Sequence, residues 1–86
     1  MTAQITILLI ESNDETRRKV AGELTGYNYT VMEASCSHEA LTKIHENPDV
    51  IITDMDLPPK PRLPKAEGVG LSIGRKFREK NQPVQN

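Results

Sequence analysis

Residues 48–58 read Pro48-Asp49-Val50-Ile51-Ile52-Thr53-Asp54-Met55-Asp56-Leu57-Pro58, an apolar run that ends in two carboxylates and a proline. No polar residue alternates with Val50, Ile51 and Ile52, a pattern typical of a central parallel strand buried on both faces. Charge is excluded from the interior of such a strand, so Asp54 is expected at its carboxyl end. Ligands and chemistry are found at that edge of open α/β sheets. Asp54 is therefore the first candidate for a functional residue.

The size and composition of the chain limit what it can be. Its 86 residues have room for one small domain, expected to span residues 1–86. The net charge of −1 argues against a dedicated nucleic-acid binder, and the single cysteine excludes an internal disulfide. No signal peptide or apolar run of membrane length is visible, so we expect a cytoplasmic protein with no membrane partner.

Charge is divided unevenly, with net −6 over residues 1–58 and net +5 over residues 59–86. The favoured interpretation is a solvated loop and helix face, and a basic docking surface is the alternative.

Part of that charge lies in a proline-rich loop over residues 58–67, which has four prolines between positions 58 and 64. This density excludes helix and strand and predicts a stiff, extended loop. A ligand for an aromatic-lined groove is a less favoured reading of the same run.

Two more strands are expected before residue 48. Residues 5–10 are apolar and β-branched and end on Glu11, whereas residues 29–34 are more polar and so nearer a sheet edge. Residues 83–84 could begin a further strand.

Three helices are expected between the strands. The first follows a cap among residues 12–14 and stops at Gly26, with Arg17 facing water. Ser35 or Ser37 is expected to cap the second, and the third spans 68–80. Their predicted apolar anchors are Val20, Ala21 and Leu24, then Ala40, Leu41 and Ile44, then Leu71, Ile73 and Phe77.

The alternation of strands and helices predicts an α/β domain. Right-handed crossovers would make the three strands parallel in the order 2-1-3. The carboxyl ends of neighbouring strands would then bring together Glu11, Ser12, Asp54 and Asp56. Converging carboxylates repel one another unless a cation lies between them, and oxygen ligands suit Mg²⁺. An aspartate beside such an ion can attack a phosphoryl group. The alternative is that these acids are simply solvated strand ends.

The chain resembles the receiver domain of two-component response regulators from about Ile5 to Val84. The resemblance rests on residues 7–11, Gly26-Tyr27, Glu39-Ala40-Leu41, residues 48–54, Leu57-Pro58, and Gly68 with Leu71. It implies a flavodoxin-like, three-layer α/β/α fold and a phosphoryl group received on Asp54 from a histidine kinase or phosphotransfer protein. It also implies Mg²⁺ held by Glu11, Asp54 and the backbone carbonyl of Asp56, and an output partner that senses the change.

The chain departs from that family in three ways. Ser12 stands where a second acid is usual, which predicts weaker Mg²⁺ binding. The loop after Pro58 is longer than usual, and the sequence ends where a fourth strand is expected, so the domain is interpreted as truncated to three strands and three helices. The hydroxyl residue and the lysine that sense the phosphate in the family are then missing. An uncovered third strand predicts self-association through that strand or the third helix, or completion by a partner.

Two other functions compete with phosphorelay. The first is a degenerate, non-phosphorylated module for protein–protein interaction or self-association. The second, a metal-dependent hydrolase, is disfavoured because the later strands and their lysine are absent, and no enzyme is expected. A zinc site on Cys36, His38 and His45 is also disfavoured. The two histidines are two helical turns apart, about 10 Å along the axis, which is too far for one tetrahedral ion.

Overall fold

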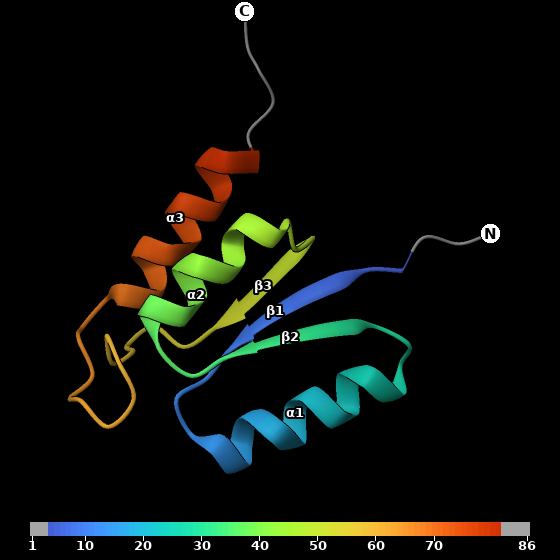
Figure 1. The fold of residues 1–86 in the computed structure, drawn as a ribbon, viewed down its shortest axis with the longest axis horizontal. Coiled ribbons are helices and arrows are strands. Elements are labelled where there is room, and N and C mark those ends of the chain that lie inside the picture. The colour runs from blue at the N-terminus through green and yellow to red at the C-terminus, as the bar shows by residue number, and fades with distance from the viewer. Residues whose placement is uncertain (1–3, 82–86) are drawn as a thin grey trace, which may run out of the picture.

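The computed structural model describes residues 4–81 and shows a three-stranded parallel sheet with helices on both faces (Figure 1). Its elements in chain order are β1 (Thr6–Ile10), α1 (Asp14–Gly26), β2 (Thr30–Ala34), α2 (Ser37–Lys43), the 3-10 helix η1 (Ile44–Glu46), β3 (Val50–Thr53) and α3 (Val69–Asn81). The strand expected over residues 83–84 lies outside the described residues. No helix within residues 4–81 is long and apolar enough to cross a membrane.

The predicted strand order is confirmed. The sheet runs β2-β1-β3, and both pairings are parallel. In the middle of the sheet Leu9 lies opposite Glu33 on one side and Ile52 on the other. Parallel pairing puts the carboxyl ends of all three strands at one edge, which is where the candidate site lies.

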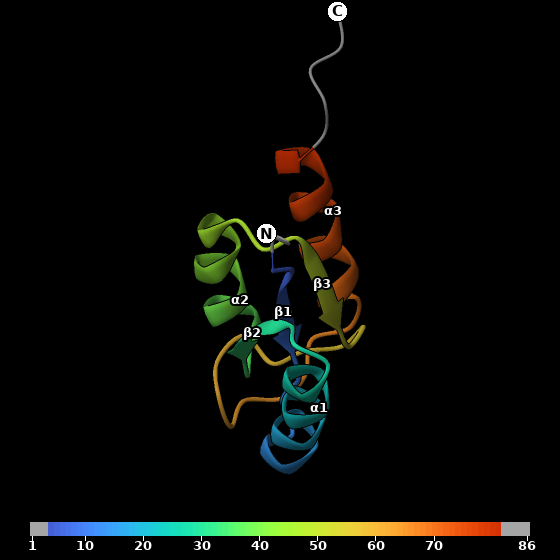
Figure 2. The same cartoon turned by 90° about the vertical axis from the view of Figure 1, so that its right-hand side faces the viewer.

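The main core lies between the sheet and the pair α2 and α3, which Figures 1 and 2 show on one side of the strands, with α1 on the other. Side chains alternate along a strand, so every second residue of β1 faces this core. The buried members of the cluster are Leu8, Ile10, Ala34, Ala40, Ile44, Leu57 and Ile73. Met32, Ile51, Val69 and Phe77 pack against it from positions that are partly exposed.

The opposite face of the sheet is covered only in part. Helix α1 packs on β1 and β2, where Ile7 and Leu9 are buried. On β3, Val50 and Ile52 remain 42% and 40% exposed when residues 4–81 are considered. The prediction that this strand is buried on both faces is therefore wrong. Ile51 packs against the core while its two neighbours point to the uncovered face. The apolar run of β3 therefore includes an exposed hydrophobic surface.

The helix boundaries are close to those expected, with a few differences in burial and capping. The Asn13 side chain caps α1 by accepting from the Thr16 N–H at 2.8 Å. Helix α2 has Cys36 at its cap position with no side-chain cap bond, so neither Ser35 nor Ser37 caps it. Two predicted apolar anchors are instead exposed, namely Leu41 and Leu71.

The proline-rich loop is closed rather than extended. Leu57 and Ala66 form an antiparallel bridge across its base, with N–H to oxygen distances of 3.3 and 2.8 Å. Leu57 is fully buried in the core, which anchors the loop. The carbonyls of Pro58 and Pro59 accept from the N–H groups of Ser37 and His38, donors that the first turn of α2 cannot pair within the helix. These contacts fold the loop back over the sheet edge.

Candidate functional site

The site begins where β1 and β3 end side by side. The Asp54 N–H donates to the Ile10 carbonyl at 3.4 Å, which continues the β1–β3 pairing by one residue. The Glu11 N–H donates to the Ala34 carbonyl at 3.0 Å, which does the same toward β2. Glu11 is therefore held at the middle of the carboxyl edge, directly beside Asp54. The predicted proximity of these two residues is confirmed.

The two side chains are close enough that Asp54 is the largest influence on the pKa of Glu11. Glu11 Oε2 is closed off from solvent and has no hydrogen-bond partner, because two ionised carboxylates offer no donor to one another. A buried acceptor without a partner costs about 1–3 kcal/mol. The pair is thus an unsatisfied, negatively charged arrangement that either a proton or a cation would relieve.

The pKa of Glu11 is raised above the ordinary glutamate value of 4.5. The largest cause is the hydrogen bond that a protonated Glu11 can make to the Asp54 side chain, followed by burial and by repulsion between the two charges. Backbone N–H groups of Ser12 and Asn13 act in the opposite direction, since they favour the carboxylate. Glu11 therefore takes up a proton more readily than an exposed glutamate.

The Asp56 side chain is not part of this pair. Its Oδ1 accepts from the Gly68 N–H at 2.9 Å, at the start of α3. Within residues 4–81 no three histidine, cysteine, aspartate or glutamate side chains are close enough to hold one metal ion. The expected convergence of three carboxylates is therefore wrong, and the structure brings together two of them. The role of the Asp56 backbone carbonyl stays a prediction.

Helix α3 is packed directly against the backbone of the site. The Gly70 N–H donates to the Met55 carbonyl at 2.7 Å, and a β-carbon added to Gly70 would lie 1.8 Å from the Asp54 backbone oxygen. Together with the contact between Asp56 and Gly68, this bond joins residues 54–56 to the first turn of α3. The backbone of Asp54 is therefore in direct contact with α3.

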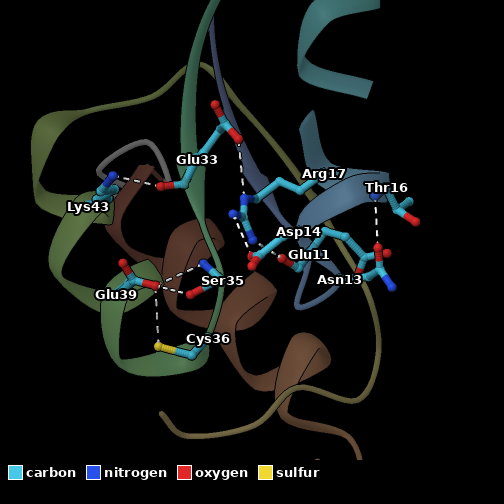
Figure 3. A network of polar contacts seen from close by, with 10 residues as sticks. All are labelled: Glu11, Asn13, Asp14, Thr16, Arg17, Glu33, Ser35, Cys36, Glu39 and Lys43. Carbon is cyan, nitrogen blue, oxygen red and sulfur yellow. Dashed lines mark hydrogen bonds and ion pairs between the residues drawn. The ribbon is translucent and has the colours of Figure 1, made fainter. Parts of the chain in front are cut away.

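Arg17 is a site-supporting residue that the sequence reasoning missed, because it was expected to face water. Its side chain is only 12% exposed and reaches three partners in Figure 3. It donates to the Glu11 carbonyl at 2.9 Å and forms ion pairs with Asp14 at 2.8 Å and Glu33 at 3.2 Å. The spacing of Asp14 and Arg17, three apart on one helix, is the signal that could have found it.

A second group of contacts fixes the end of β2. The Glu39 carboxylate accepts from the Ser35 N–H at 3.0 Å, from the Ser35 hydroxyl and from Cys36 Sγ at 3.6 Å (Figure 3). The Ser35 hydroxyl is the main reason that the pKa of Glu39 is lowered. Lys43 Nζ donates to the Glu33 carbonyl at 2.6 Å. These bonds place Ser35 beside Ser12 at the carboxyl edge.

A comparison of the chain with models of known protein families finds no match, and a search of curated proteins finds none either.

Proposed function

We propose that the chain is a receiver-like phosphorelay domain with a flavodoxin-like fold, in which Asp54 accepts a phosphoryl group from a histidine kinase or phosphotransfer protein. One observation carries the proposal: Glu11 and Asp54 meet at the carboxyl ends of neighbouring parallel strands, and Glu11 Oε2 is buried there without a hydrogen-bond partner. The parallel order β2-β1-β3 supports it because this order places ligand sites at that edge.

The residues present fit a magnesium ion. Mg²⁺ is bound through one or two carboxylates and keeps several waters, so a third side chain is not required. Glu11 and Asp54 would hold the ion, with the backbone carbonyl of Asp56 as a further ligand. Ser12 offers no charge, which makes the site a weak one. When bound, the ion offsets the negative charge of the carboxylates and of an incoming phosphoryl group.

Asp54 supplies the nucleophile in this proposal. A carboxylate oxygen of Asp54 attacks the phosphorus of a phosphohistidine, and the phosphorus–nitrogen bond breaks. The electron pair stays on the imidazole nitrogen, which then takes up a proton. The product is an aspartyl phosphate whose backbone is in contact with Gly70, so the change in charge and size at position 54 would bear on α3.

Fluorine NMR of the chain with beryllofluoride and Mg²⁺ tests the proposal, because beryllofluoride mimics a phosphoryl group on aspartate. We expect a bound-fluoride signal that requires Mg²⁺ and disappears in Asp54→Asn. Glu46→Gln is the matched control, since it removes one negative charge from an exposed position on η1. Absence of the signal in the unaltered chain, or its persistence in Asp54→Asn, would contradict phosphorylation at Asp54.

A second candidate function is an interaction module that is not phosphorylated. It is favoured by the uncovered apolar face, which includes Ile5, Val50 and Ile52, and by the position of β3 at the edge of the described sheet. An exposed strand edge offers unpaired backbone groups to another chain. Association without any beryllofluoride signal would favour this candidate over the first.

A further inference from the structure

A cavity of about 490 Å³ opens at the carboxyl edge of the sheet, next to the carboxylate pair but not lined by it. We call it the loop pocket. One wall carries Ser12, Asp14 and Ser35, and the other is the proline-rich loop with Arg62 and Lys65. Its size is within the range of about 300–1,000 Å³ that is usual for small-molecule sites.

Both walls of the loop pocket are fixed by bonds already described. Ser12 follows Glu11 and Ser35 follows Ala34, and the bond between Glu11 N–H and the Ala34 carbonyl holds these two strand ends together. The loop wall is held by the bridge across its base and by its two bonds to the start of α2. The pocket is therefore formed without a ligand, which lowers the entropy lost on binding.

The charges around the loop pocket favour an anion. Arg62 and Lys65 line it with positive charge, and within residues 4–81 neither makes a hydrogen bond or ion pair. The one carboxylate in the lining, Asp14, is already paired with Arg17 at 2.8 Å. Within residues 4–81, Arg62 and Lys65 are therefore available to pair with an anion in the pocket.

The available donors match the oxygens of a phosphate. The guanidinium of Arg62 presents N–H groups in a planar fork, and the ammonium of Lys65 presents three more donors. The Ser12 hydroxyl is a further donor, whereas the Ser35 hydroxyl is already committed to Glu39. Arg62 also has a left-handed backbone (φ 71), uncommon for a residue other than glycine, and such conformations cluster at functional sites.

We infer that the loop pocket binds the phosphate group of a small phosphate ester, with Arg62, Lys65 and Ser12 as its donors. The pocket is larger than one phosphate ion, so it has room for the organic part of the ester. This inference does not depend on phosphorylation of Asp54, because neither Asp54 nor Glu11 lines the pocket.

Titration of the ¹⁵N-labelled full chain with ribose 5-phosphate, without Mg²⁺ or beryllofluoride, tests the inference by NMR. We expect saturable shifts at the amides of Ser12 and Ser35 and at those of Arg62, Leu63 and Lys65, and none with ribose. Arg62→Gln with Lys65→Gln should weaken binding at least about tenfold, as expected for charge-assisted hydrogen bonds. The matched control is Arg75→Gln with Lys76→Gln, two exposed positions on α3 that should bind like the unaltered chain.

Several results would overturn the inference. Ribose 5-phosphate could give no saturable shifts in a folded chain, or ribose could give the same shifts. The double variant at 62 and 65 could bind as tightly as the control. Inorganic phosphate binding as tightly as the ester would also overturn it, because the organic part would then contribute nothing. Arg62→Lys with Lys65→Arg, which keeps both charges, should retain binding and shows that the loop tolerates substitution.

Discussion

Gly70 and Asp54 touch backbone to backbone: a β-carbon on Gly70 would lie 1.8 Å from the Asp54 carbonyl oxygen. The Gly70 N–H also donates to the next carbonyl along, that of Met55, at 2.7 Å. A residue with a side chain at position 70 would push the first turn of α3 away from the end of β3. This contact links the candidate phosphoryl acceptor to a helix with an exposed outer surface.

The substitution Gly70→Ala should therefore destabilise the chain. We expect a loss of about 3 kcal/mol in the free energy of unfolding, the upper part of the usual range for overpacking, because backbone atoms must move. Gly74→Ala is the matched control on the same helix. A β-carbon there meets nothing within 4 Å, so alanine should stabilise by about 1 kcal/mol. Urea unfolding measures both, and equal effects of the two substitutions would refute the close packing at Gly70.

Glu11→Gln should stabilise the chain at neutral pH and reduce its pH dependence. Since the pKa of Glu11 is raised in the folded state, the folded chain binds this proton more tightly than the unfolded chain. The associated stability is fully present below the ordinary value of 4.5 and is lost as the pH rises through the raised value. Glutamine stays neutral at all of these pH values, so this loss of stability does not occur. We expect the free energy of unfolding at neutral pH to rise by up to about 1 kcal/mol, as for other partly solvated charge pairs.

Urea unfolding across this pH range measures the effect of Glu11→Gln. Glu46→Gln, at an exposed position on η1, controls for the change in net charge. A Glu11→Gln chain that is less stable than the unaltered one at neutral pH would show that the two carboxylates do not oppose each other.

Arg17→Gln should destabilise the chain although arginine is usually a surface residue. The substitution removes ion pairs to Asp14 and Glu33 and the bond to the Glu11 carbonyl. We expect the free energy of unfolding to fall by about 1–2 kcal/mol, since hydrogen bonds to charged groups contribute more stability than neutral ones. Arg18→Gln, the exposed neighbour, should change stability by less than about 0.5 kcal/mol. Similar losses for both variants in thermal unfolding would place Arg17 among ordinary surface residues.

The uncovered face of β3 predicts self-association. Val50 and Ile52 present apolar surface beside a strand edge that is unpaired within the described sheet. Sedimentation velocity at increasing protein concentration should show dimers or larger species. Ile52→Lys should shift the chain to monomer if β3 is the contact, because edge lysines oppose strand pairing. A shift to monomer in Leu71→Lys, on the exposed surface of α3, would identify the helix as the contact instead. A monomer at all concentrations in the unaltered chain would exclude both surfaces.

Much of the fold could be predicted from local sequence patterns. The β-branched runs predict the strands, and the short crossovers between them leave few topologies, so the order β2-β1-β3 follows. The position of Glu11 beside Asp54 follows in turn, because each residue comes directly after one of two neighbouring parallel strands.

The remaining features depend on contacts between distant residues. An apolar run does not reveal which helix covers each face, so the exposure of Val50 and Ile52 could not be predicted. Proline density indicates the absence of helix and strand, but the closure of the loop depends on the burial of Leu57. Arg17 lies on a helix face that would be solvated in isolation and is instead drawn toward carboxylates on two elements.

The most direct test of the central claim is intact mass spectrometry after incubation with acetyl phosphate and Mg²⁺. Phosphorylation at Asp54 predicts a mass increase of one phosphoryl group that is lost without Mg²⁺ and in Asp54→Asn, and is kept in Glu46→Gln. No mass increase in the folded, unaltered chain at millimolar Mg²⁺, or an equal increase in Asp54→Asn, would contradict it.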